Sequence, residues 1–169
     1  MQEGQETQGN NGALQASIVG ENWKGKVTKD SLSSLQGRLA QIKNANSIGS
    51  LGFLQLKSPV VGLILGLLFG GFAADRFYKG DVGLGILKLL VVWGSFFMAM
   101  MVGAFSTAVG AVAAGEAGAA AGMVAGLGFG FVGFLIGFFW ILLDLLLVWK
   151  GIKRDNFNKI NTQLLLCGV

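Results

Sequence analysis

The chain has 169 residues, of which 53% are hydrophobic and only 13% are charged. An ordinary soluble domain carries about 25% charged residues, so this composition excludes that class, and the length leaves room for a single domain. The formal net charge is +4, with basic residues in excess near both ends. We therefore expect a protein whose partner is the lipid bilayer and whose flanks are positively charged.

The sequence lacks the side chains on which most enzymes and metal sites depend. It has no histidine, the usual general base near neutral pH and the commonest metal ligand, and a single cysteine, Cys167. The basic residues are few and divided between the two ends, which does not fit nucleic-acid binding. We expect no enzymatic activity, no cofactor, no metal and no nucleic-acid partner.

Residues 1–29 are rich in Gln, Gly, Asn and Glu. Such a segment has few apolar groups to offset the entropy lost on ordering, so it predicts a mostly disordered polar tail. No apolar segment follows a basic start in this region. We therefore expect no cleavable secretory signal, and expect the first membrane span to act as its own signal.

Residues 30–56 are expected to form an amphipathic and then interfacial segment. Apolar residues recur at spacings of three and four, which is typical of one face of a helix that is capped by Asp30 or Ser31. This face could rest on a membrane, pack on a partner protein, or pair with a second copy as a short coiled coil, the least favoured of the three. The residues of this stripe are Leu32, Leu35, Leu39 and Ile42.

A membrane domain is predicted over residues 57–150. Uncharged apolar runs occupy residues 58–74, 89–115 and 117–143, and about 20 such residues cross a hydrocarbon core roughly 30 Å thick. The predicted architecture is an all-α membrane protein with about three transmembrane helices. These helices are expected near residues 58–74, 82–114 and 118–149, followed by a basic C-terminal tail at 151–169.

Small residues recur every four positions along each apolar run. Such faces let helices approach closely in lipid, where apolar side chains gain nothing by leaving their surroundings. The pattern therefore predicts tight packing through glycine-striped faces, either within one chain or between copies around a pore. The glycines expected at these contacts are Gly62, Gly66, Gly70, Gly103, Gly115, Gly118, Gly122, Gly126 and Gly130.

Three charges interrupt the apolar block, namely Lys88, Glu116 and Asp144. Glu116 is flanked by glycine, which favours a turn between two antiparallel helices. Lys88 and Asp144 are equally far from Glu116 along the chain, so a hairpin folded there would bring these opposite charges together. Alternatively, Lys88 extends to the headgroups and Asp144 faces water, each independently.

The number of spans stays open at this level. Three spans place the two basic flanks on opposite sides of the membrane, whereas Lys and Arg prefer the cytoplasmic side. Two spans with a hairpin that does not cross completely, or four short spans, would keep both flanks together.

The motif Asp75-Arg76-Phe77-Tyr78, followed by Gly80, Gly83 and Gly85, resembles the TM2 domain family. Gly66, Gly70 and Gly71 match the glycine-rich first helix of that family, and Trp140 and Asp144 match the end of its second helix. The chain would then carry a long Gly/Ala-rich insertion near residues 92–138, which divides the second helix. The resemblance implies a small membrane protein with no established catalytic chemistry.

The motif also has a physical interpretation of its own, as a rigid interfacial turn. Asp75 and Arg76 can pair with each other or with Lys88 and Asp144. The rings of Phe77 and Tyr78 suit the depth of the lipid headgroups, and Asp81 can cap the following helix.

Two functions fit these features. The first is a membrane-permeabilising oligomer in which Lys88, Glu116 or Asp144 lines a water path, as in an antibacterial effector that reaches its target in a carrier protein. The second is a membrane scaffold that recruits a partner through the amphipathic stripe. The expected location is a bacterial inner membrane, or that of a target cell after secretion. The expected partners are the bilayer and further copies of the chain, or a membrane or carrier protein.

Overall fold

The structure is a computed structural model that describes residues 3–42 and 45–169, and within these residues it is helical with no strand. The chain divides into two compact units. The terminal unit comprises Met1–Gly62 and Val148–Val169, and the hairpin unit comprises Leu63–Leu147. Residues 1–2 and 43–44, which belong to the expected tail and amphipathic segment, lie outside the described part.

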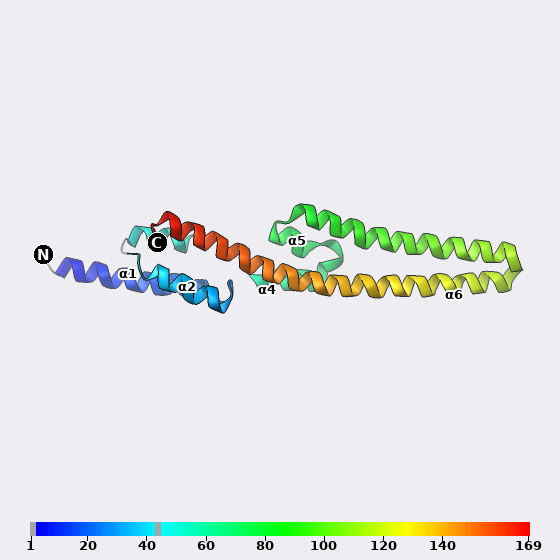
Figure 1. Cartoon of the computed structure of the whole chain (residues 1–169), viewed down its shortest axis with the longest axis horizontal. Helices are drawn as coiled ribbons and strands as arrows, with labels where there is room; N and C mark the ends of the chain where they lie inside the picture. The colour runs from blue at the N-terminus through cyan, green and yellow to red at the C-terminus, as the bar shows by residue number, and fades with distance from the viewer. Residues whose placement is uncertain (1–2, 43–44) are drawn as a thin grey trace. The chain divides into compact units, whose positions relative to one another are not determined.

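The terminal unit contains α1 (Glu3–Asn22), α2 (Lys29–Leu39), α3 (Ala45–Gly52) and the last part of α6 (Val82–Leu166), as Figure 1 shows. Its core brings together side chains from both ends of the chain. The fully buried members are Trp23, Leu35, Leu39, Ile48, Leu51, Ile160 and Leu164.

The expected disordered tail over residues 1–29 is wrong, because α1 is helical and its end is buried. Val19, Trp23 and Val27 are 6%, 1% and 4% exposed and belong to the core of the terminal unit. Burial of these three side chains offsets the entropy cost of ordering the segment, although its composition is polar on average.

The amphipathic helix exists as α2 (Lys29–Leu39), but its N-cap lies two or three residues earlier than expected. Its N-cap is Thr28, whose hydroxyl accepts a hydrogen bond from the backbone N–H of Ser31 at 3.4 Å. Leu35 and Leu39 are buried, and Ile42 is 9% exposed. The stripe therefore packs into the chain's own core, as do Ile48 and Leu51 of the segment that was expected to lie at a membrane interface.

The basic C-terminal tail expected at residues 151–169 is helical, because α6 continues through it to Leu166 and belongs there to the terminal unit. Asn156 is 1% exposed there and ties distant segments together. Its Oδ1 accepts a hydrogen bond from the backbone N–H of Lys57 at 3.1 Å, and its Nδ2 donates to the carbonyls of Lys26 and Lys57 at 2.9 and 2.7 Å. Arg38 also donates to the side chain of Asn161.

The first apolar helix is shorter than expected. The run at residues 58–74 contains α4 (Pro59–Phe69), which has 11 residues, and the 3-10 turn η1 (Gly70–Phe72). At about 1.5 Å per residue, α4 is roughly 16 Å long, about half the thickness of a hydrocarbon core. α4 ends at Phe69, whose φ of −128° and ψ of 25° are not helical, and η1 then ends at Ala73, which adopts a left-handed conformation with φ of 55°.

The long helix α6 is a hairpin, as Figure 1 shows by its course out and back. Ala114 and Gly115 leave the helical conformation, and Gly115 has φ of 62°, a value that glycine adopts without strain. The turn expected beside Glu116 is confirmed. We call residues 82–113 the first arm and residues 116–147 the second arm.

The two arms touch through their glycines in the half nearest the turn. A Cβ atom added to Gly118 would overlap the carbonyl of Gly110, and one added to Gly122 would overlap the carbonyl of Ser106. A Cβ on Gly126 would lie 2.6 Å from Cα of Gly103. In this half of the hairpin the backbones are therefore in direct contact, which only glycine permits.

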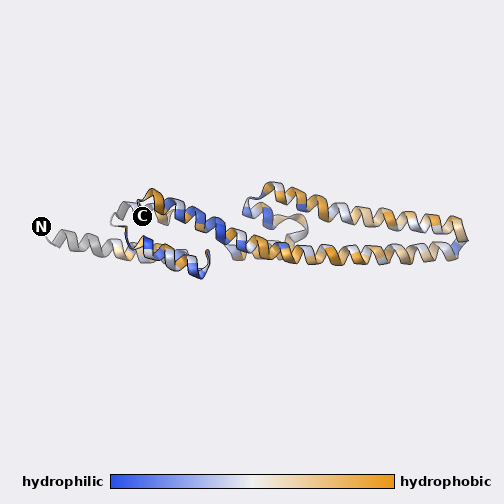
Figure 2. Cartoon of the chain, viewed as in Figure 1, coloured by the Kyte–Doolittle hydropathy of each residue, from blue (hydrophilic) through white to orange (hydrophobic). Residues whose placement is uncertain are grey.

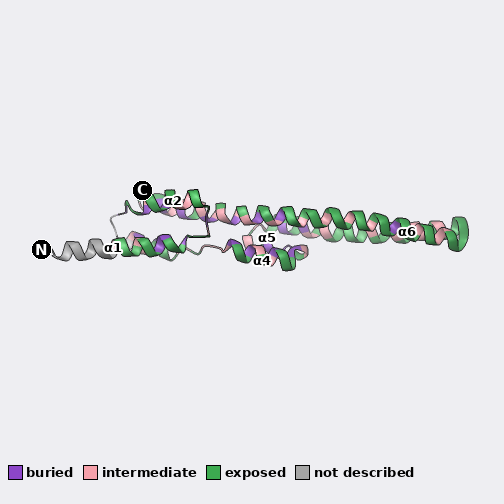
Figure 3. Ribbon diagram, turned by 90° about the horizontal axis from the view of Figure 1, so that it is seen from below, coloured by how far each residue is buried: buried purple, intermediate pink, exposed green. Residues whose placement is uncertain are grey.

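The outer surface of the hairpin is apolar and exposed (Figures 2 and 3). Met101, Phe105, Val124 and Phe129 are each 70% to 72% exposed. Among the described residues, α6 is the one helix long and apolar enough to cross a membrane, and only 11% of its most apolar window is buried. Packing of the two arms against each other therefore leaves this apolar surface uncovered.

Candidate functional site at the base of the hairpin

Two tight turns position a cluster of charged side chains in the hairpin unit. Ala73 is buried, and its carbonyl accepts hydrogen bonds from Arg76 and Phe77, which begins α5 (Ala74–Lys79). Gly80, with φ of 102°, ends this helix and donates to the carbonyls of Arg76 and Phe77. The cap satisfies the last carbonyls of α5 and leads directly into α6.

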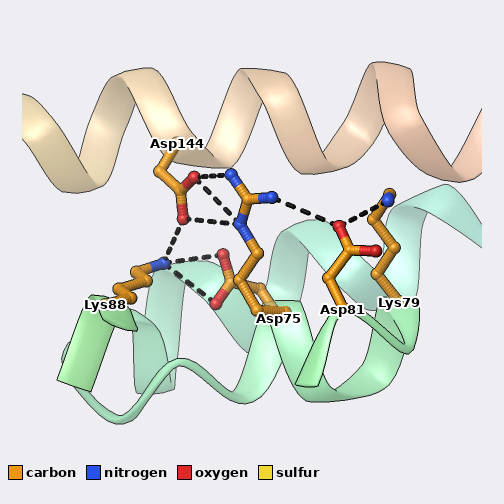
Figure 4. Close-up of polar contacts among 6 residues, drawn as sticks. Asp75, Lys79, Asp81, Lys88 and Asp144 are labelled. Carbon is orange, nitrogen blue, oxygen red and sulfur yellow. Dashed lines mark hydrogen bonds and ion pairs between the residues drawn. The ribbon is translucent and has the colours of Figure 1, made fainter. Parts of the chain in front are cut away.

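Lys88 links two carboxylates at the start of the first arm (Figure 4). Its Nζ lies 3.0 and 2.8 Å from the two carboxylate oxygens of Asp75, and 2.6 Å from Oδ2 of Asp144. The side chains of Lys88, Asp75 and Asp144 are only 3%, 0% and 6% exposed. The ammonium group therefore joins α5 to the second arm inside the protein.

Arg76 makes a second link between the same elements. Its Nε donates to both oxygens of Asp144 at 3.0 and 3.2 Å, and its Nη2 bonds to the same carboxylate. Its Nη1 lies 3.3 Å from Oδ2 of Asp81, to which Lys79 also donates at 2.5 Å. We call these six residues, three cations and three anions, the ion network: Asp75, Arg76, Lys79, Asp81, Lys88 and Asp144.

Electrostatics in the turn favour the charged forms of Asp81 and Arg76. Hydrogen bonding from Lys79, reinforced by the positive charges of Lys79 and Arg76, holds the pKa of Asp81 below its ordinary value. The hydrogen bond to Asp144 raises the pKa of Arg76, although burial opposes this effect. Because the three positive and three negative charges balance, the network avoids the cost of an unpaired buried charge.

The sequence spacing identified the central part of this network. The pairing of Lys88 with Asp144 is confirmed, and Asp75 and Arg76 pair with these two residues rather than with each other. Asp81 stands at the cap position before α6, where its backbone carbonyl accepts a hydrogen bond from the N–H of Gly85 at 2.8 Å, while its carboxylate binds Arg76 and Lys79.

Lys79 was missed as a member of the network. Lys79 follows Arg76 by three residues, so the two cations lie next to each other on one face of a short helix. This spacing could have predicted that both cations share a carboxylate.

The remaining candidates lie apart from the network. Glu116 is exposed and follows the turn of the hairpin directly. Phe77 is 40% exposed, and its ring lies against Gly85, where an added Cβ would approach it to 2.9 Å. Tyr78 is partly buried. Gly66 and Gly70 face Leu145 and Ile141 of the second arm, whereas Gly130 has no heavy atom within 4 Å of an added Cβ.

The chemistry of the network is structural. No buried side-chain nitrogen or oxygen in the described part of the chain lacks a hydrogen-bond partner. Among the described residues, no group of three or more His, Cys, Asp or Glu side chains is placed to hold a metal ion. The arrangement therefore fastens α5 and the base of the first arm to the second arm.

Residues 55–105 match the TM2 domain family. This confirms the resemblance, and together with the apolar hairpin it supports a membrane location. The matched part contains five of the six network residues and continues along the first arm to Phe105 without a break, so Trp140 and Asp144 lie outside it. The expected division of the family's second helix is therefore not supported. No curated protein and no solved structure matches the chain.

Proposed function

We propose that this TM2-domain protein inserts its hairpin into a bilayer from one side and, as an oligomer, permeabilises that membrane. The observation that carries the proposal is the exposed apolar surface of the folded hairpin. Both arms are already paired, yet large side chains such as Met101, Phe105 and Phe129 remain at least 70% exposed. Water does not tolerate an apolar surface of this extent, whereas lipid or further copies of the chain would cover it.

The dimensions of the hairpin suit a complete crossing. Uncharged residues 89–115 and 117–143 each extend about 40 Å at 1.5 Å per residue, which exceeds a hydrocarbon core of roughly 30 Å. The ion network stands at one end of these runs and Glu116 at the other. This distribution would put charges near both faces of the membrane and none at its centre.

The terminal unit supports an even number of crossings. Trp23 and Leu35 from the N-terminal part share one core with Ile160 and Leu164 from the C-terminal part. If this unit lies on one side of the membrane, the chain leaves and re-enters that side, which favours two crossings by the arms. The short helix α4 would then enter the bilayer without crossing it, and both basic flanks would lie on one side.

A water path through a single hairpin is disfavoured. The arms are in backbone contact at Gly118 and Gly122, and Lys88 and Asp144 are engaged in the ion network. Permeabilisation would therefore require several copies, with Glu116 near the mouth of the path. Gly128 is exposed and has no heavy atom within 4 Å of an added Cβ, which leaves room for a neighbouring helix.

The biological setting in this proposal is an antibacterial effector that is brought to the target cell's inner membrane by a carrier protein. The exposed apolar hairpin would need such a carrier before insertion. This part of the proposal makes a direct prediction: the chain should require a carrier or detergent to stay dispersed in water.

A membrane scaffold is the second candidate, with a binding surface that differs in part from the one expected. Leu35 and Leu39 of the stripe are buried in the chain's own core, so the stripe as a whole is not free to bind a partner. A cleft of about 540 Å³ on the terminal unit favours this role instead, because it lies between small residues of α1, including Gly12, Ala13 and Ala16, and the end of the stripe at Leu39 and Ile42. Leu14 and Ile18 of α1 are 61% and 56% exposed.

Dye release from liposomes tests the first candidate against the second. We expect the purified wild-type chain to release dye with a steeper than linear dependence on protein density. Gly128→Leu should reduce release, because it fills an exposed face open to neighbouring copies without disturbing the contact between arms. Gly83→Leu is the matched control, since this glycine is also open but lies outside the uncharged runs. Insertion without dye release at any protein density would refute permeabilisation and favour the scaffold.

A further inference from the structure

We infer that Lys150, Lys153 and Arg154 form a binding surface for the headgroups of anionic phospholipids, which we call the basic face. The inference rests on the proposed insertion of the hairpin, but not on permeabilisation. It assigns a lipid class to the side of the membrane on which the terminal unit would lie.

The position of the basic face along α6 suits a membrane surface. The three residues follow the apolar sequence Leu145–Leu146–Leu147 within about two helical turns, where a helix that leaves the hydrocarbon meets the headgroups. Lys153 and Arg154 follow Lys150 by three and four residues, which puts all three on one side of the helix. Lys150 and Arg154 are exposed, and Lys153 is partly buried.

The opposite side of the same helix is held in the core of the terminal unit. Ile152, Asn156, Ile160 and Leu164 recur every fourth residue and are each at most 1% exposed. Asn156 fixes the rotation of this helix through its hydrogen bonds to Lys26 and Lys57. The helix therefore cannot turn its basic side inward without breaking that core.

The charges of the basic face are available to an outside anion. Lys150 and Arg154 have no ion pair with any carboxylate in the part of the chain that the structure describes, unlike the cations of the ion network. Nζ of Lys153 lies 5.0 Å from the centroid of the Trp149 ring, a cation–π contact that leaves its charge uncompensated by an acid.

Trp149 supports a lipid headgroup over other anionic partners. Tryptophan is enriched at membrane interfaces, because its ring is apolar and its N–H is polar. Here a tryptophan directly precedes the basic residues on a helix that continues from the apolar second arm. Each Lys or Arg near an anionic bilayer contributes about a fivefold preference over a neutral one, so three together would contribute up to about a hundredfold.

Energy transfer from tryptophan to dansyl-labelled lipid tests the inference in the full-length chain. Protein would be reconstituted in phosphatidylcholine vesicles that contain a trace of either dansyl-phosphatidylglycerol or dansyl-phosphatidylcholine. We expect the anionic probe to give the stronger transfer by several-fold, and we expect added salt to weaken that preference. The triple variant Lys150→Gln, Lys153→Gln and Arg154→Gln should remove the preference while transfer from the neutral probe stays unchanged.

The matched control removes the same charge elsewhere in the terminal unit, by Lys24→Gln, Lys26→Gln and Lys29→Gln. It should keep the wild-type preference. Equal transfer from both probes in the wild type would overturn the inference, as would an equal loss in the control variant. Absence of transfer from either probe would instead show that the chain does not enter the bilayer, and would overturn the proposed function as well.

Discussion

Removing the carboxylate of Asp144 is the most direct test of the ion network. In Asp144→Asn the side chain keeps its size, but Arg76 and Lys88 lose their shared counter-ion. Lys88 keeps Asp75 and Arg76 keeps Asp81, so the base of the hairpin holds one uncompensated positive charge. Asp144 itself is 5% exposed, which leaves little room for water to screen that charge.

The size of the effect follows from the contacts that are lost. Hydrogen bonds to charged groups contribute about 1.5–3 kcal/mol each, and Asp144 accepts such bonds from two different cations. Breaking a buried ion pair by removing one partner costs about 3–5 kcal/mol. We therefore expect Asp144→Asn to lower the free energy of unfolding by about 3–5 kcal/mol.

A double-mutant cycle separates pairing from a general loss of packing. Lys88→Met removes the matching positive charge, and the double variant Lys88→Met with Asp144→Asn restores a balance of charges. The loss in free energy of unfolding in the double variant should be smaller than the sum of the losses in the two single variants by at least about 1 kcal/mol.

Unfolding would be followed by circular dichroism in mixed micelles as the fraction of denaturing detergent rises. Additive costs in the cycle would refute the network as the source of stability, as would a cost of less than about 1 kcal/mol for Asp144→Asn.

Three further predictions concern other parts of the molecule. Gly122→Leu should force the arms apart and lower the free energy of unfolding in micelles by at least about 1–3 kcal/mol, whereas Gly128→Leu, which faces open space, should change it little. Trp23→Ala should cost about 3–5 kcal/mol in the terminal unit, seen as faster hydrogen exchange in α1, α2 and the end of α6 but not in the arms. Because the pKa of Asp81 is lowered in the folded protein, its contribution to stability is complete above about pH 4 and is lost as pH falls through the folded value. Lys79→Met should move that loss to higher pH in unfolding curves measured between pH 2 and 6, and an unchanged pH profile would contradict the assignment.

Local features of the sequence predicted most of the structure of the hairpin unit. A lone carboxylate between glycines indicated the turn, and the equal distances of Lys88 and Asp144 from it indicated their pairing. The motif Asp75 to Tyr78 indicated both the TM2 resemblance and a tight turn before the first arm. These inferences succeeded because a helical hairpin relates positions along the chain to positions in space by a constant rise per residue.

The length of the first apolar helix could not be predicted from local features. Residues 58–74 are almost uniformly apolar, and nothing in that run marks the end of α4 at Phe69 or the left-handed conformation of Ala73 after η1. This turn is compatible with the burial of Ala73 and with the contact of Gly70 against Ile141, which comes from the second arm. The end of the first apolar helix thus coincides with a contact to a helix far along the chain.

Composition and charge spacing by themselves determined that the chain has two long apolar arms, where they reverse, and which opposite charges meet at their base. Only the tertiary structure decided that the two ends form one folded unit, because Trp23 and Leu35 are buried by Ile160 and Leu164 from more than a hundred positions away. Burial of this kind has no local signature. A polar segment with a few apolar side chains orders only when a distant surface completes its core, so its entropy cost is offset by contacts that no window of sequence contains.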